Sequence, residues 1–186
     1  MNKIDVIPLE IPEIKLIITR KINDSRGFFS ETYNEKAFHK AGITEKFVQD
    51  NHSLSEARGT IRGLHFQTPP YEIAKLVRVT RGRILDVVLD IRKASPSFGK
   101  HVAVELSPTE WHQLLVPIGF AHGFCTLESN TEVVYKVTNY YSKEHDKGIL
   151  WNDSSLGIIW PVSEKEAILS EKDLGWPNLV AARELL

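Results

Sequence analysis

Short segments rich in β-branched and aromatic residues constrain the fold of this chain more than any other feature. They cover residues 14–20, 75–79, 84–91, 102–106, 114–116, 124–127 and 132–140. Turn residues separate them, for example Arg81-Gly82 and Ser129-Asn130. Many short strands with such punctuation are typical of a sandwich or a jelly-roll barrel. We therefore predict an all-β fold.

Helical signals are weak and lie outside this central region. A short helix is predicted over residues 35–41. Another is predicted over 163–173, where Ser163 is the expected N-cap and Glu166 occupies the capping-box position. No repeat, low-complexity tract or Gly/Ser linker divides the 186 residues, so we expect a single domain, 1–186.

The net charge and the cysteine content limit which partners the protein can bind and in which compartment it is expected. The formal net charge is −1, so no global basic field exists to gather nucleic acid or an anionic membrane. The single cysteine, Cys125, excludes an intrachain disulfide framework and is compatible with a reducing compartment. The N-terminal stretch lacks the pattern of a signal peptide, and no apolar run approaches the roughly 20 residues of a membrane span. We expect a soluble, cytoplasmic protein that binds neither nucleic acid nor membrane.

The segment 47–67, FVQDNHSLSEARGTIRGLHFQ, has an unusual density of polar side chains for a strand-rich region. Buried polar groups need partners, so the segment forms either a solvated face or the wall of a polar pocket. Apolar residues interrupt it, including Phe47, Ile61 and Leu64, and they indicate that it is anchored in the fold. This favours the pocket. Its polar members include Gln49, Asn51, His52, Arg62, His65 and Gln67.

A second constellation is LVPIGFAHGF at 115–124, where Pro117, Gly119 and His122 form P-x-G-x-x-H, as in the second motif of cupins. Metal-holding cupins usually present H-x-H in their first motif. Here that place contains His65-Phe66-Gln67, so one ligand is missing. Catalytic zinc normally needs three or four protein ligands. We therefore expect no functional metal.

Strand periodicity also orients Tyr135. In 132–140 successive side chains face opposite sides, so Val133, Tyr135 and Val137 share one face. A tyrosine between valines is usually a core residue. The same parity would also let Tyr135 project into a ligand cavity of a barrel.

Taken together, the chain closely resembles the dTDP-4-dehydrorhamnose 3,5-epimerase family. The resemblance extends from about residue 4 to residue 177, and eight pieces occur in the expected order. They are RGFFSETYN (26–34), FVQDNHS (47–53), RGLHFQ (62–67), AKLVR (74–78), DIRKASPSFGK (90–100), PIGFAHGF (117–124), VYKVTNYYS (134–142) and ILWNDSSLGIIWP (149–161). The resemblance implies a cupin-type double-stranded β-helix, or jelly-roll barrel, with short peripheral helices. It also implies a homodimer that needs no cofactor and acts on a dTDP-linked 4-keto-6-deoxysugar.

The resemblance also implies roles for individual residues. His65 is the general base, Asp173 its carboxylate partner and Tyr135 the acid on the opposite face of the sugar ring. Lys75 lies near the C4 carbonyl oxygen. Asp146 stands where relatives commonly carry Glu. Contacts with the substrate or its diphosphate are implied for Arg26, Glu31, Gln49, Asn51, Arg62, Lys75, His122, Asp146 and Lys172.

These residue types suit the chemistry. A ketone at C4 makes the protons at C3 and C5 weakly acidic, and removing either gives an enolate. Histidine has an ordinary pKa of about 6.5 and is suited to be a base near neutral pH. A carboxylate fixes its tautomer, a tyrosine with a pKa near 10 can deliver a proton, and a cation stabilises the oxyanion.

Three alternatives stay open at this stage. A mono-epimerase that inverts only C3 or only C5 would share the same residues. A cupin that binds a sugar nucleotide without turnover would need neither base nor acid. A metal-dependent cupin oxygenase or isomerase would need the histidine that Gln67 replaces.

Overall fold

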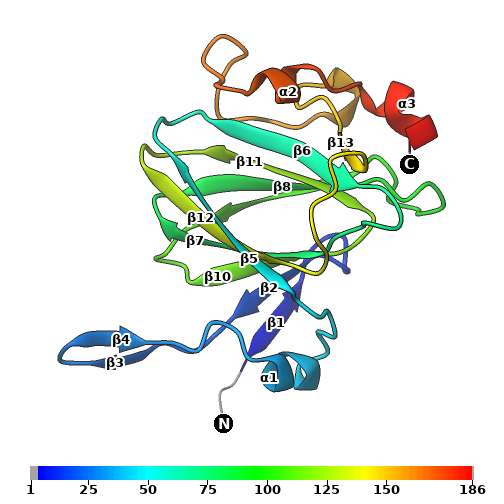
Figure 1. Ribbon diagram of the computed structural model, residues 1–186. Coiled ribbons are helices and arrows are strands. Elements are labelled where there is room, and N and C mark those ends of the chain that lie inside the picture. Colours follow the sequence, from blue (N-terminus) through cyan, green and yellow to red (C-terminus); the bar gives the residue numbers. More distant parts are fainter. Residues whose placement is uncertain (1–3, 186) are drawn as a thin grey trace.

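The computed structural model describes residues 4–185, and two antiparallel β-sheets packed face to face dominate it (Figure 1). The ends of the predicted domain, residues 1–3 and 186, lie outside the described residues. The six-stranded sheet has the order β1 (Asp5–Pro8), β2 (Lys15–Ile18), β10 (His112–Val116), β7 (Lys75–Arg81), β12 (Thr131–Val137) and β5 (Gln49–Ser55). The five-stranded sheet has the order β13 (Asp146–Gly148), β6 (Ile61–Gln67), β11 (Phe120–Thr126), β8 (Ile84–Asp90) and β9 (His101–Leu106).

Each of the seven predicted strand segments coincides with a strand of these sheets, so the all-β prediction is confirmed. The polar segment 47–67 forms two strands, β5 and β6, which lie in different sheets. Its polar side chains can therefore approach one space from two sides. A separate hairpin of β3 (Ile22–Asp24) and β4 (Gly27–Phe29) projects away from the sheets (Figure 1).

An apolar core fills part of the space between the sheets. Val77 and Val133 from the six-stranded sheet meet Val88 and Phe124 from the five-stranded sheet, and all four are at most 5% exposed. Burying each such side chain contributes roughly 1.5–3 kcal/mol. This core holds the two sheets at a fixed separation. The strands that contribute to it also carry the polar residues of the cavity described below.

The helix predicted over 35–41 is confirmed as α1 (Glu35–Lys40). Asn34 caps it by accepting a hydrogen bond from the Ala37 backbone N–H at 3.1 Å. Phe38 is 1% exposed and packs with Ile17, Ile43, Leu76 and Leu115. Residues Ile17, Leu76 and Leu115 come from β2, β7 and β10, so α1 anchors against the six-stranded sheet.

The helix predicted over 163–173 is wrong. The capping-box contacts do form, because Glu166 accepts hydrogen bonds from the Ser163 backbone N–H and hydroxyl at 3.0 and 2.7 Å. They close only a turn. Ile168 then pairs with the backbone beside β6, where it donates to Gly59 O at 3.0 Å and accepts from Ile61 N at 2.9 Å. Pairing with a distant segment therefore overrides the local helical signal.

The C-terminal segment crosses the five-stranded sheet instead (Figure 1). It contains two short α-helices, α2 (Glu171–Leu174) and α3 (Leu179–Ala182), flanked by the 3₁₀ helices η1 (Ser154–Leu156) and η2 (Arg183–Leu185). Ser170 caps α2 and thereby fixes the position of Asp173 against β6. Across residues 4–185, none of the helices is both long and apolar enough to span a bilayer.

Candidate active site

Two adjoining cavities open between the sheets beside the C-terminal segment. The larger has a volume of about 490 Å³ and the smaller about 350 Å³. His65, Lys75, Tyr135 and Lys172 line both, so the cavities form one continuous site. Of the other predicted residues, Arg62, His122 and Asp173 line the larger cavity, and Gln49, Asn51 and Asp146 line the smaller one.

His65 reaches this site from the middle of β6. Gly63 makes this position of His65 possible. The φ of Gly63 is +140°, which residues with a side chain disfavour, and a methyl group on Gly63 would collide with the Gly123 backbone. The close approach lets β6 and β11 pair with a register shift, with His122 opposite His65. The two histidines therefore lie on neighbouring strands, although 57 positions separate them in the chain.

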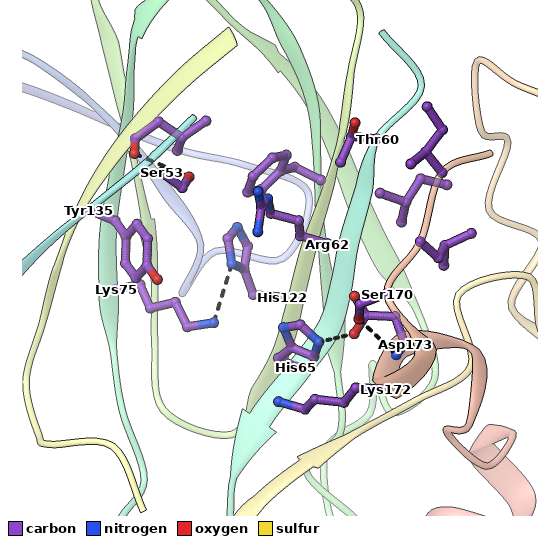
Figure 2. Close-up of a pocket in the computed structure, with 15 residues that line it drawn as sticks. Ser53, Thr60, Arg62, His65, Lys75, His122, Tyr135, Ser170, Lys172 and Asp173 are labelled. Carbon is purple, nitrogen blue, oxygen red and sulfur yellow. Dashed lines mark hydrogen bonds and ion pairs between the residues drawn. The ribbon is translucent and has the colours of Figure 1, made fainter. Parts of the chain in front are cut away.

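His65 Nε2 bonds to Asp173 Oδ1 at the wall of the cavity (Figure 2). The Asp173 side chain is 5% exposed and that of His65 is 28% exposed. Burial raises the pKa of Asp173, but hydrogen bonds from His65, Ser170 and Trp176 outweigh it and lower the pKa overall. An ionised Asp173 holds the proton of the imidazole on Nε2, which leaves the Nδ1 lone pair available.

A second histidine–aspartate pair, formed by His122 and Asp86, is more deeply buried at the wall of the larger cavity. His122 Nε2 donates to Asp86 at 2.9 and 3.0 Å, and its Nδ1 lies 3.4 Å from Lys75 Nζ (Figure 2). Burial lowers the pKa of His122 and exceeds the opposing effect of Asp86. A neutral His122 thus donates to Asp86 and accepts from Lys75, so both ring nitrogens are engaged.

Lys75 is the cation at the centre of the site. Burial lowers its pKa to about 8, although Asp86 and Asp146 act in the opposite direction. Near neutral pH the ammonium form therefore still predominates. Its orientation follows from the Asp86–His122 pair below it, so this pair can aim the ammonium group into the cavity.

Tyr135 approaches from the opposite sheet. It lies on β12 between Val133 and Val137 on the inward face, which confirms the predicted parity. Figure 2 shows Tyr135 and His65 on opposite sides of the cavity with the Lys75 side chain between them. Burial raises the pKa of Tyr135 and the charge of Arg62 only partly offsets this, so the phenol remains protonated.

Polar side chains extend the site in both directions. In the smaller cavity, Gln49 donates to Asn51 at 2.7 Å, while Asp146 pairs with Lys172 and accepts from the Tyr141 hydroxyl at 3.0 Å. In the larger cavity, Arg62 donates to Ser55 Oγ at 3.2 Å. The site therefore has cations and hydrogen-bonding groups on either side of the His65–Tyr135 pair.

Two predicted ligand residues are not part of this site within one chain. Arg26 and Glu31 lie at the β3–β4 hairpin and just after it, and neither lines the cavities. The side chain of Arg26 is 88% exposed and pairs with Asp24 at 2.6 Å. Sequence reasoning also missed Asp86. A carboxylate within the apolar strand sequence ILDVVLDI requires a buried partner, so the sequence itself could have indicated that Asp86 pairs with another polar side chain.

His65 and His122 each pair with a carboxylate. Within residues 4–185, no cluster of three or more histidine, cysteine or acidic side chains is positioned to hold a metal ion. Cys125 is buried, and burial raises the pKa of its thiol to about 11. It is therefore an unreactive thiol.

Comparisons with known proteins identify the family of this chain. The family profile described as dTDP-4-dehydrorhamnose 3,5-epimerase matches residues 8–181. This chain belongs to that family. A relative of that name from Sinorhizobium fredii is 52% identical over 92% of this chain and 87% of its own length. The resemblance deduced from the sequence motifs is thus confirmed, and the family is one of isomerases.

Solved structures of the family show the same fold. That of dTDP-4-dehydrorhamnose 3,5-epimerase from Bacillus anthracis, with TDP and PPi bound, is 50% identical with a TM-score of 0.91, over 95% of this chain and 99% of that chain. That of the 3,5-epimerase from Legionella pneumophila, in complex with dTDP-4-keto-L-rhamnose, is 41% identical with a TM-score of 0.93, over 99% and 97%. The cupin-type jelly-roll prediction is confirmed.

The mono-epimerase alternative is represented at greater distance. A 3'-monoepimerase from Streptomyces bikiniensis, solved with dTDP-quinovose, is 30% identical with a TM-score of 0.87, over 96% of this chain and 90% of that chain. The comparisons therefore favour the double epimerase over the single one.

Proposed function

We propose that the protein inverts C3 and C5 of dTDP-4-dehydro-6-deoxy-D-glucose and so produces dTDP-4-dehydro-L-rhamnose for dTDP-L-rhamnose synthesis. The observation that carries the proposal is the placement of a histidine base and a protonated tyrosine on opposite sides of one cavity, with a buried ammonium group between them. Inversion next to a ketone requires a base, an acid on the opposite face and stabilisation of the enolate oxygen, and these three groups can supply them. A protein that only binds the sugar nucleotide would not need them.

In this mechanism His65 Nδ1 removes the proton from C5, and the C–H electron pair forms the enolate with C4. Asp173 stabilises the resulting imidazolium. Lys75 stabilises the enolate oxygen, and a preorganised donor of this kind typically contributes about 3 kcal/mol. Tyr135 then gives its proton to C5 from the opposite face, and the same sequence is repeated at C3. Proton exchange with water restores His65 and Tyr135 after each inversion.

The nucleotide end of the substrate needs cations and hydrogen-bond donors. We propose that Arg62 and Lys172 contact the diphosphate, since guanidinium and ammonium groups are its natural partners. Gln49, Asn51, His122 and Asp146 line the remaining walls and complete the proposed binding set. The TDP and PPi bound to the Bacillus anthracis enzyme support a nucleotide ligand of this type.

A homodimer is part of the proposal. Phe28 and Phe29 on the β3–β4 hairpin are 54% and 67% exposed, and a lone two-stranded hairpin is marginally stable in water. A second copy would cover these rings, and the hairpin of one copy would then bring Arg26 and Glu31 to the cavity of the other. Sedimentation that shows only a 21 kDa monomer at micromolar concentration would contradict this part.

Metal independence, a single domain and a cytoplasmic location complete the proposal. His65 and His122 each bind a carboxylate, and the continuous family match over residues 8–181 supports one domain. The free, buried thiol of Cys125 is compatible with a reducing compartment. Activity should survive prolonged chelation and should not respond to zinc, manganese or iron. Loss with EDTA and recovery with one metal would contradict metal independence.

The decisive experiment incubates the protein with dTDP-4-dehydro-6-deoxy-D-glucose in D2O and follows the product by proton NMR. The double epimerase introduces deuterium at both C3 and C5 and inverts both centres. Deuterium and inversion at one carbon alone would identify a mono-epimerase. Unchanged substrate would point to a protein that only binds the nucleotide sugar.

A further inference from the structure

Trp176, two residues beyond α2, contacts the His65–Asp173 pair. Its indole Nε1 donates to Asp173 Oδ1, the oxygen that binds His65, at 3.4 Å. Its ring meets the His65 imidazole edge to face, with ring centres 6.3 Å apart. The Lys172 ammonium group lies 5.4 Å from the centre of the same ring. One side chain thus touches the carboxylate, the imidazole and a neighbouring cation.

Space for this ring exists because residue 148 is a glycine. Gly148 pairs with His65 across β13 and β6, so it lies directly beside the base. A methyl group at this position would lie 2.5 Å from Nε1 and 2.6 Å from two carbon atoms of the Trp176 ring. The φ of Gly148 is not in the left-handed region, so the backbone itself would accept alanine. A glycine is therefore needed at position 148 only to leave room for the Trp176 ring.

The backbone next to Trp176 is anchored as well. Pro177 O accepts a hydrogen bond from Leu150 N at 2.8 Å, two residues beyond Gly148. Gly175 N donates to Lys172 O at 3.2 Å. The indole is thereby held between the end of α2 and the edge strand of the five-stranded sheet.

We propose that Trp176 is a positioning residue that sets the orientation and charge of the His65–Asp173 pair, and that Gly148 admits its ring. This inference rests on the proposed epimerase function. A hydrogen bond from the indole withdraws charge from the carboxylate and fixes its plane. Without it, Asp173 would stabilise the imidazolium form of His65 more strongly and hold the ring less firmly.

The test compares Trp176→Phe, which retains an aromatic ring but loses the N–H donor, with the parent enzyme. We expect the acid limb of the pH profile of kcat/KM to move to higher pH by roughly 0.5 unit, because one weak charge-assisted hydrogen bond is lost. The other ionisable groups that line the two cavities are unchanged in this variant; they are Arg62, Lys75, His122, Tyr135, Tyr141, Asp146 and Lys172.

The matched control is Trp160→Phe. The Trp160 indole donates to Trp151 O at 2.8 Å, away from the cavity, so this variant also loses one indole hydrogen bond. Its acid limb should coincide with that of the parent. An unshifted profile in Trp176→Phe, or an equal shift in the control, would overturn the proposal.

Gly148→Ala supplies an independent test through a double-mutant cycle. It should lower kcat/KM about 10-fold in the parent, and less than 2-fold in a Trp176→Ala background where the ring is absent. Equal losses in both backgrounds would count against the fit. NMR titration of the His65 imidazole, assigned with His65→Asn, should show the same shift in Trp176→Phe. That readout needs no turnover, so an inactive parent would refute the epimerase proposal while the titration still decides the role of Trp176.

Discussion

The two histidine–aspartate pairs of this protein have the same chemical groups and different surroundings. His122 and Asp86 are both nearly inaccessible, and both ring nitrogens of His122 are engaged, by Asp86 and by Lys75. His65 pairs with Asp173 through one nitrogen, and within residues 4–185 its Nδ1 has no hydrogen-bond partner. A base needs a free lone pair that substrate can reach. The comparison therefore supports the proposal that His65 transfers the proton and that His122 holds Lys75 in place.

Chain connectivity explains why the pairs differ. Asp86 and His122 lie on adjacent strands, β8 and β11, with His122 opposite Val88 in the ladder, so sheet pairing buries them together. Asp173 comes from a short helix in the tail and reaches His65 across 108 positions of sequence. A carboxylate supplied from a covering segment leaves one face of the imidazole open. A carboxylate supplied from the sheet interior does not.

The largest effect is expected from removing the base. His65→Asn should abolish epimerisation and solvent deuterium exchange together, with losses of at least about 10³-fold, because no enolate forms. The measurement follows carbon-bound deuterium and product stereochemistry in D2O. His52→Asn is the matched control, since His52 is exposed, pairs with Glu132 and does not line the cavities. Continued exchange in His65→Asn would mean that another group, His122 included, is the base.

Tyr135→Phe separates the two halves of the reaction. The base and the ammonium group remain, so the enolate still forms, and deuterium can return to carbon from the His65 face without inversion. Inversion should fall by roughly 10² to 10³, and exchange should fall much less. The same D2O assay reports both quantities. If this variant inverts C5 at the parental rate, the acid lies elsewhere and the opposed arrangement of His65 and Tyr135 has no catalytic meaning.

Replacing each of the two carboxylates by an amide should have different main effects: Asp173→Asn should mainly lower activity, and Asp86→Asn should mainly lower stability. Asp173→Asn should lower kcat roughly 10- to 100-fold, less than the loss of His65, because the base survives with a poorly held tautomer. Its stability should change little. Asp86→Asn should lower the free energy of unfolding by about 1.5–3 kcal/mol, because it removes the charged acceptor of a fully buried hydrogen bond. Denaturant unfolding and steady-state kinetics of both variants check this, and equal profiles would remove the distinction between the pairs.

The smallest effect concerns pH and Lys75. Its ammonium form should be lost as pH rises through about 8, so kcat/KM should decline about 10-fold per pH unit above that value. Lys75→Arg, which keeps its charge, should lack this decline. Stability should behave oppositely. The pKa of Lys75 is lower in the folded protein, so between about pH 8 and 10.5 the unfolded chain binds more protons and the folded parent gains stability as pH rises. Lys75→Met removes the cost of burying a charge and should be more stable than the parent near neutral pH, and this difference should shrink between about pH 8 and 10.5. A decline that persists in the arginine variant would assign it to another group.

The sequence alone determined the class of fold and predicted most of the polar residues that line the cavities. Alternation with a period of two is a local property, so strands such as β8 and β12 and the inward direction of Tyr135 could be predicted from neighbouring residues. The motifs around His65, Lys75 and His122 identified the family because they occur in a characteristic order along the chain. Both the local periodicity and the order of the motifs can be read directly from the amino-acid sequence.

Only the tertiary structure decided the features that depend on contacts between distant segments. The capping contacts at Ser163 form, but Ile168 pairs with the backbone beside β6, so the segment makes a turn and no helix follows it. The positions of Arg26 outside the cavity and of Trp176 against Asp173 follow from where a hairpin and a tail lie in space. The physical reason is that a contact between distant segments, such as the hydrogen bond between His65 and Asp173 across 108 positions, has no local signature in the sequence. The hydrogen bonds of Ile168 with Gly59 and Ile61 nevertheless contribute enough energy to override a local helical preference.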